Sequence, residues 1–171
     1  LAGLAIPFGI IYLIGMLDTT IRGRKDIEDK LSIPFLGDIP EYHGSTRQGS
    51  VVVRDNGRDS VSEAFRLIRS NLGFMSVKSG KLQIIMVTSS DPHAGKTFVT
   101  TNLAMTLALA DKKVVIVDLD LRRRTLSKQM GQRDNRNGVS GYISGTIANL
   151  NDIVFQSGLH ENLDIIFAGL Q

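Results

Sequence analysis

The chain has no cysteine and only three histidines among its 171 residues. The lack of cysteine excludes a disulfide framework and a metal site built from thiolates, and it leaves the redox compartment open. His43, His93 and His160 are scattered along the chain and do not have the spacing of a ligand cluster. The sequence also has no internal repeat and no low-complexity tract. Its function must therefore be sought in local motifs.

Charged side chains are absent from residues 1–17, which are dominated by Leu, Ile, Ala, Gly and Phe. The run is a little shorter than the ~20 residues that cross a bilayer. Because no initiator Met and no basic segment precede it, residues 1–18 predict a truncated transmembrane helix rather than a signal peptide, with a buried core helix as the alternative. Arg22, Arg24 and Lys25 follow, so the positive-inside rule predicts that everything after residue 18 is cytoplasmic.

Length and composition indicate about one domain, since 42% of the residues are hydrophobic. The net charge of +3 is modest, and the basic residues cluster near residues 22–25 and 122–136. Residues 19–59 are expected to be a cytoplasmic juxtamembrane linker, rich in Gly, Ser, Arg and Asp after residue 41, with at most one short strand at residues 51–53. The domain itself is expected to span residues 60–171.

A helix is predicted over residues 63–76, with Ser60 or Ser62 as its N-cap. Its apolar residues form one stripe that is expected to be buried. These residues are Phe65, Leu67, Ile68, Leu72 and Met75. Glu63, Arg66 and Arg69 recur at every third position and drift around the side of the helix, away from this stripe. They are expected to form an ionic row that faces solvent.

A nucleotide-phosphate loop is the most informative motif. Residues 84–89 are apolar and β-branched, as in a buried parallel strand, and a helix-like pattern follows over residues 98–110. Between them, Gly95-Lys96-Thr97 fits the end of a phosphate loop, in which backbone N–H groups hold phosphates, the lysine reaches the β- and γ-phosphates and the hydroxyl ligates Mg²⁺. The residues expected around ATP are Ser90, Asp91, Pro92, His93, Ala94, Gly95, Lys96 and Thr97.

A second strand, Val114-Val115-Ile116-Val117, leads directly into Asp118-Leu119-Asp120. A short helix is expected at residues 142–147, a short apolar piece at residues 150–155 and a third strand at residues 163–167. The order of these elements predicts an α/β domain with a parallel sheet, flanking helices and right-handed crossovers. Three strands and the lack of a further acidic strand after Asp120 indicate that the domain is incomplete and the chain an interior fragment.

Four motifs together resemble the bacterial tyrosine kinases, or BY-kinases, of capsule and exopolysaccharide export systems. They are Leu36-Gly37-Asp38-Ile39-Pro40, the E-x-x-R-x-x-R spacing of Glu63, Arg66 and Arg69, the loop from Ser89 to Thr97, and Val117-Asp118-Leu119-Asp120-Leu121-Arg122. In that family, a membrane-anchored chain-length regulator runs into a cytoplasmic P-loop domain. The resemblance covers nearly all of the chain.

The resemblance implies transfer of the ATP γ-phosphoryl to tyrosines, mainly in a C-terminal cluster of a neighbouring subunit. It assigns Lys96 to the β- and γ-phosphates, and Thr97, Asp118 and Asp120 to the Mg²⁺ site, with Asp118 holding the metal's water shell or accepting the tyrosine proton. It makes Glu63, Arg66 and Arg69 a subunit-contact row, against the alternative of a solvated helix face.

The resemblance also implies where the protein acts and with what. The expected location is the inner membrane of a bacterium. The expected partners are further copies of the chain, the membrane, the polysaccharide export machinery and a cognate tyrosine phosphatase, but not nucleic acid. Regulation of exopolysaccharide or capsule polymerisation is the expected role.

Two departures from the family pattern qualify this interpretation. The loop contains His93-Ala94 where Gly-Glu is common, and Ser90 stands where the general phosphate-loop pattern has its first glycine. The tyrosine cluster is absent, since the chain has only Tyr12, Tyr42 and Tyr142. Two alternatives remain: a partition- or division-site-type ATPase, disfavoured because Ser90 and Asp91 replace its usual lysine, and a structural polysaccharide co-polymerase gated by nucleotide.

Overall fold

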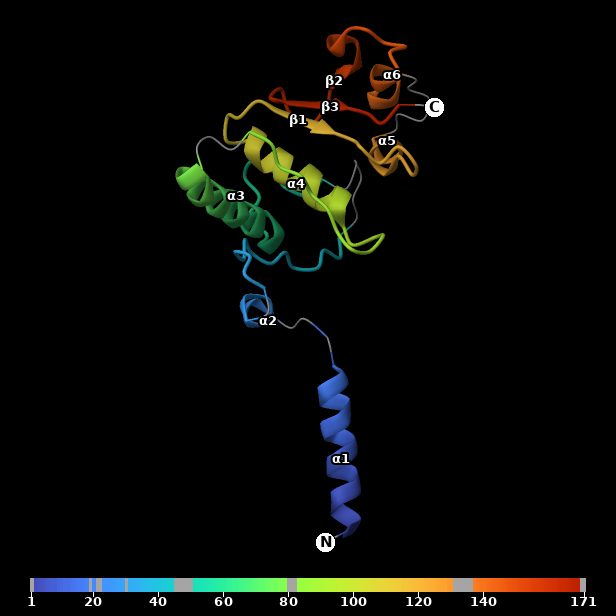
Figure 1. Cartoon of the computed structure of the whole chain (residues 1–171). Coiled ribbons are helices and arrows are strands. Elements are labelled where there is room, and N and C mark those ends of the chain that lie inside the picture. Colours follow the sequence, from blue (N-terminus) through green and yellow to red (C-terminus); the bar gives the residue numbers. More distant parts are fainter. Residues whose placement is uncertain are drawn as a thin grey trace. The chain divides into compact units, whose positions relative to one another are not determined.

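The computed structural model describes residues 2–18, 20, 23–29, 31–44, 51–79, 83–130 and 137–169. It divides into two compact units, Leu1–Gly37 and Asp38–Gln171, drawn in Figure 1. The helices are α1 (Ala2–Leu17), α2 (Arg24–Glu28), α3 (Ser60–Ser79), α4 (Lys96–Ala108), α5 (Thr125–Gln129), α6 (Val139–Ile143) and the 3₁₀ helix η1 (Leu150–Ile153). The strands are β1 (Val114–Val117), β2 (Val154–Gln156) and β3 (Leu163–Ile166). The predicted α/β class is confirmed.

The first unit consists of two helices and the segment after them. The uncharged run forms α1, which has 16 residues. In the short helix α2, Arg24 pairs with Glu28 at 2.7 Å, one turn later, and its guanidinium lies 5.7 Å from the ring centroid of Phe35. Within the part of the chain that the structure describes, none of the helices combines the length and the apolar character needed to span a membrane.

The sheet of the second unit has the strand order β1-β3-β2. β1 and β3 are parallel, with Val114 opposite Leu163 and Val117 opposite Ile166, as the sequence predicted. β2 pairs with β3 in the antiparallel sense, so the prediction of a wholly parallel sheet is wrong at this edge. The reason is the connection between them: only residues 157–162 separate β2 from β3, whereas a parallel crossover needs a dozen or more residues.

Residues 84–89, predicted as a buried strand, have no regular secondary structure. Their side chains are largely exposed, with Ile84 86% and Met86 81% accessible. An apolar, β-branched run becomes a strand only where neighbouring backbone offers hydrogen-bond partners. In the described sheet, β1 pairs with β3 alone, and no ladder reaches residues 84–89. The prediction of a strand before the phosphate loop is therefore wrong for this structure.

Helix α4 lies between α3 and the sheet, as Figure 1 shows. On one side, Ala104 and Ala108 pack in a cluster with β1 and β3. On the other, Leu103 packs with Val53, Val61 and Phe65. Burial on both sides explains why α4 carries small apolar residues around much of its circumference. The helix that follows the phosphate loop is thus the centre of the domain.

Helix α3 confirms the predicted helix but differs in its cap and its buried face. Asp59 caps it, because its carboxylate accepts from the backbone N–H (2.9 Å) and the hydroxyl (2.6 Å) of Ser62. The predictions of Ser60 or Ser62 as the N-cap are therefore wrong. Leu67 and Met75 are 55% and 44% exposed, so the predicted stripe is too wide. Neighbouring positions on a helix point about 100° apart, and Leu67 turns outward beside the buried Ile68.

The segment around Val52 and Val53 contributes to the core, although it was predicted as a linker with at most a short strand. No strand forms; instead, both backbone N–H groups donate to the side-chain oxygen of Asn102 on α4, at 2.8 and 3.1 Å. Val53 is only 2% exposed and Asn102 is fully buried. One amide oxygen thus satisfies two backbone donors that a strand would have placed in a ladder.

The C-terminal helix is displaced from its predicted position of residues 142–147, since α6 begins at Val139. The chain after β3 fixes this start: the backbone N–H groups of Val139 and Ser140 donate to the carbonyls of Phe167 (2.9 Å) and Ala168 (3.0 Å). A side chain at Gly138 would collide with Phe167 and Gly169, so only glycine permits this approach. The predicted apolar piece at residues 150–155 divides into η1 and β2.

Candidate active site

The phosphate loop ends at the N-terminus of α4. Gly95 is the N-cap residue and has a left-handed backbone (φ 85°), which glycine adopts without strain. His93, two residues earlier, is also left-handed (φ 66°), so the loop turns sharply twice. The cap provides no side-chain acceptor, and the first backbone N–H groups of the helix are therefore available to an anion.

The side chain of Lys96 forms hydrogen bonds with the loop that precedes it. Its ammonium donates to the Ser89 hydroxyl at 2.7 Å and to the Asp91 carbonyl at 3.3 Å. The Ser89 hydroxyl donates in turn to the same carbonyl at 2.7 Å. These contacts hold a positive charge at the start of α4, where a phosphate would receive both the ammonium and the helix N–H groups. Ser89 belongs to the loop motif but was not among the residues expected around ATP.

Two further loop residues have polar side chains near this centre. The Ser90 hydroxyl donates to the Asp91 carboxylate at 3.1 Å, so Asp91 is held on the outer side of the loop. Thr97 occupies the second position of α4, and its carbonyl accepts from the Thr101 hydroxyl at 2.8 Å. The loop residues predicted from the sequence therefore form a series of bends and turns that leads directly into α4.

Asp118 lies directly after β1 and is only 7% exposed. Its backbone N–H continues the ladder to Ile166 (2.9 Å), and its Oδ1 accepts from the Asp120 N–H at 3.0 Å. Its Oδ2 is buried and has no hydrogen-bond partner. Burial raises the pKa of Asp118, and the Asp120 carboxylate adds to the rise, while the backbone N–H of Asp120 and the neighbouring Ser127, whose own Oγ is buried without a partner, oppose it. A buried acceptor oxygen without a donor is rare in native proteins and indicates a place for a cation or a donor.

Asp120 organises the turn that follows. Its Oδ1 accepts from the backbone N–H of Arg123 at 2.9 Å. The Arg123 side chain reaches the phosphate loop, where its Nη1 lies 3.2 Å from Nε2 of His93. This contact joins the two loops that carry the predicted site residues, 30 positions apart in the chain. Sequence reasoning missed it, because neither residue belongs to a motif that specifies a pair.

These residues fit a magnesium nucleotide. The loop offers an ammonium and free helix N–H groups to phosphates, and Asp118 offers an unpartnered carboxylate oxygen. Across the described residues, no group of three or more His, Asp or Glu side chains could hold a metal without other ligands. Mg²⁺ fits such a site, because it keeps several waters and binds through one or two carboxylates together with substrate phosphates.

A cavity of about 550 Å³ adjoins the loop. Two segments line it, one before α3 and one around the start of α4. They supply Ile39, Pro40, Glu41, Tyr42 and Gly44 from the first, and His93, Ala94, Gly95, Phe98 and Val99 from the second. The cavity is thus partly apolar, and the N-cap of α4, Gly95, forms part of its wall.

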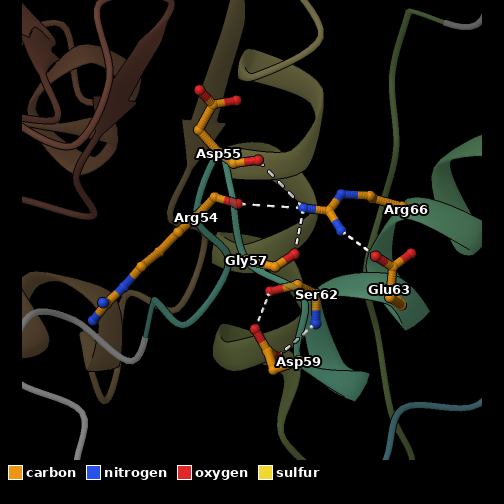
Figure 2. A network of polar contacts seen from close by, with 7 residues as sticks. All are labelled: Arg54, Asp55, Gly57, Asp59, Ser62, Glu63 and Arg66. Carbon is orange, nitrogen blue, oxygen red and sulfur yellow. Dashed lines mark hydrogen bonds and ion pairs between the residues drawn. The ribbon is translucent and has the colours of Figure 1, made fainter.

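The E-x-x-R-x-x-R residues lie on α3, and Figure 2 shows how Arg66 is held. Its guanidinium pairs with the Glu63 carboxylate and donates to the carbonyls of Gly57 (2.7 Å), Asp55 (3.4 Å) and Arg54 (3.5 Å). Arg69 donates to the Thr106 carbonyl of α4 at 3.2 Å. The two arginines therefore make contacts inside the domain, whereas the Glu63 side chain is 61% exposed.

Known proteins share this architecture. Residues 85–168 match the family model described as the CobQ/CobB/MinD/ParA nucleotide binding domain. A putative tyrosine-protein kinase in the cps region of Klebsiella pneumoniae is 30% identical over 167 residues, covering 86% of this chain and 23% of the relative. The tyrosine-protein kinase Etk of Escherichia coli strain K12 is 40% identical over 91 residues, covering 53% of this chain and 12% of the relative.

A solved structure of the kinase domain of Escherichia coli Etk matches with a TM-score of 0.74 and 29% identity, covering 88% of this chain and 60% of that chain. The chain belongs to the family of the bacterial tyrosine-protein kinases. The resemblance drawn from four motifs is confirmed at this level. The chain spans about a quarter or less of the length of these two curated relatives.

Proposed function

We propose that the chain carries the nucleotide-binding part of a protein-tyrosine autokinase, which transfers the γ-phosphoryl of ATP to tyrosine hydroxyls. Two observations support the proposal together: Lys96 places its ammonium at the start of α4, and Asp118 carries a buried Oδ2 without a hydrogen-bond partner. The His93–Arg123 contact joins the two loops that bear them. The kinases among the relatives support this reaction over simple ATP hydrolysis.

Each residue has a defined role in the proposed reaction. Lys96 offsets charge on the β- and γ-phosphates, and the backbone N–H groups at the start of α4 orient them. Thr97, Asp118 and Asp120 would hold Mg²⁺, which would neutralise phosphate charge. Because burial raises its pKa, Asp118 holds a proton more readily than an exposed aspartate until a cation arrives.

The decisive experiment replaces Lys96 by Met in the full-length protein. Lys112→Met serves as the matched control, because Lys112 is an exposed lysine just beyond the other end of α4. Lys96→Met should abolish phosphotyrosine and leave the circular dichroism spectrum unchanged, because Met keeps the length of this half-buried side chain and the two hydrogen bonds that are lost lie within the loop. Undiminished phosphotyrosine in Lys96→Met would remove this site from the mechanism.

Membrane anchoring is part of the same proposal. The uncharged helix α1 is followed by Arg24 and Lys25, which favours a cytoplasmic location for the rest of the chain by the positive-inside rule. A role in exopolysaccharide or capsule polymerisation and export is supported by the relative from a cps region. A reporter enzyme fused after Lys30 should be active on the cytoplasmic side of the inner membrane; activity outside the membrane would contradict the orientation.

We also propose that Glu63, Arg66 and Arg69 mark a contact between copies of the chain. Glu63 is the exposed member of the three, while Arg66 and Arg69 stabilise the domain itself. Glu63→Gln is therefore a sharper test than replacing all three residues, with the exposed Glu161→Gln as its control. Glu63→Gln should lower the mass measured by light scattering, and an unchanged mass would leave the row as a solvated face.

A further inference from the structure

Tyr42 shares a cavity with the phosphate loop. The chain has only Tyr12, Tyr42 and Tyr142 as tyrosines. Tyr12 lies in α1 and Tyr142 in α6, whereas Tyr42 lines the cavity of about 550 Å³ together with His93 and Gly95. Gly95 is the N-cap of α4, where phosphates are expected. Tyr42 therefore lines the same cavity as the N-cap of α4.

Packing fixes the segment that carries this tyrosine. Ile39, three residues earlier, packs against the buried cluster that includes Phe65 and Leu103. Phe98 and Val99, which follow the loop on α4, pack against the same cluster. The segment before Tyr42 and the start of α4 thus rest on one core.

Gly44 leaves room for the ring of Tyr42. A side chain at this position would collide with the hydroxyl and the ring of Tyr42, so the ring lies folded back over the Gly44 backbone. Tyr42 remains 37% exposed, which leaves its ring partly accessible from the cavity. The arrangement holds a phenol beside the loop without burying it.

We propose that Tyr42 is an intrachain acceptor of the phosphoryl group. This inference rests on the proposed kinase function and names one of its substrates. The Tyr42 oxygen attacks the γ-phosphorus of ATP, and the new O–P bond forms as the bond from that phosphorus to the β,γ-bridging oxygen breaks. ADP leaves with the electron pair of that bond, and the phenol proton passes to water. The product is phosphotyrosine, which adds about −1.5 to −2 charges beside His93 at neutral pH.

The test uses the full-length protein incubated with ATP and Mg²⁺, with phosphorylated peptides identified by mass spectrometry. Phosphate should be found on the peptide that contains Tyr42, and Tyr42→Phe should remove that signal. Tyr142→Phe is the control, because Tyr142 lies on α6 outside this cavity, and it should retain phosphate on Tyr42. Phosphotyrosine elsewhere with unmodified Tyr42 overturns this inference alone, whereas the absence of all phosphotyrosine overturns the proposed function as well.

Two further measurements separate the proposed geometry from chance modification. When an epitope-tagged Lys96→Met chain is mixed with the wild type, Tyr42 of the tagged chain should carry less than about a tenth of the wild-type phosphate, because transfer is intrachain. Equal phosphate on both chains overturns the assignment. Gly44→Ala should lower phosphate on Tyr42 at least severalfold, because its methyl group displaces the ring; an unchanged level overturns the role of the folded ring.

Discussion

The guanidinium of Arg123 and the imidazole of His93 meet at 3.2 Å, between Nη1 and Nε2. Arg123 is always protonated and can only donate, so this contact is a hydrogen bond in the tautomer of His93 in which Nε2 accepts. The contact joins the phosphate loop to the turn after Asp120, whose carboxylate holds the backbone of the same arginine. The contact therefore connects the two loops that carry the proposed nucleotide site.

Replacing His93 by Lys should weaken ATP binding, because two cations would then face each other where a donor meets an acceptor. His93→Gln is the matched variant, because its amide oxygen keeps an acceptor for Arg123. Both side chains are exposed, so the expected loss for Lys is on the order of 1 kcal/mol, or about fivefold in Kd. Titration of the full-length protein with a fluorescent ATP analogue measures both variants. Equal affinities for Lys and Gln would show that the contact does not position the loops.

Asn102 should be among the most sensitive positions in the domain. Asn102→Ala removes the oxygen that accepts from both Val52 and Val53, and it leaves two buried N–H groups without a partner. The expected loss in unfolding free energy is about 2–4 kcal/mol. Urea denaturation checks it against Asn151→Ala, a change at an exposed asparagine, which should cost less than about 0.5 kcal/mol. A similar midpoint for both variants would contradict the importance of this amide.

Local sequence patterns predicted the parts of the fold that depend on interactions between residues close together in the chain. The apolar spacing of α3 and α4 gave both helices, and the β-branched runs gave β1 and β3. The phosphate loop and the acidic turn followed from residue spacing, and the structure connects them through His93 and Arg123. These features depend on neighbours within a few positions. They could therefore be predicted from the sequence alone.

Features that depend on residues far apart in the chain could not be predicted from local patterns. Residues 84–89 have the composition of a strand, but a strand also needs a partner ladder, which no pattern within the segment can supply. The buried pairing of Val52 and Val53 with Asn102 spans about 50 positions and has no signature in sequence. Asp59 was overlooked as a cap because Ser60 and Ser62, one and three residues later, are equally good candidates by type.

Replacing Arg66 by Lys should destabilise the domain. Its planar guanidinium reaches the Glu63 carboxylate and the Gly57 carbonyl at the same time, which a single ammonium cannot do. Arg66→Lys is expected to lower the unfolding free energy by about 1 kcal/mol, and Arg66→Ala by somewhat more, since the side chain is partly buried. Thermal unfolding measures both, with the exposed Arg58→Ala as a control. If Arg66→Lys matched the wild type, the forked contact in Figure 2 would contribute nothing.

The buried Asp118 carboxylate should lower the free energy of unfolding of the protein without nucleotide. Burial raises its pKa above the ordinary value of 3.8, so the native state binds a proton more tightly than the unfolded state does. The slope of unfolding free energy against pH is then negative: stability is greatest below the unfolded pKa and falls as the pH rises through the folded one. Asp118→Asn removes this loss, so it should raise Tm at neutral pH and flatten the decrease in stability above about pH 4.

The same substitution should abolish the stabilisation that ATP and Mg²⁺ give to the wild type, because the amide cannot replace the carboxylate at the cation. Differential scanning fluorimetry across pH, with and without ATP and Mg²⁺, measures both effects on the full-length protein. Asp152→Asn, a change at an exposed aspartate, should leave the response to ATP and Mg²⁺ intact. If Asp118→Asn lowers Tm without nucleotide, then the buried carboxylate stabilises the fold, and its unpartnered oxygen is not held ready for a cation.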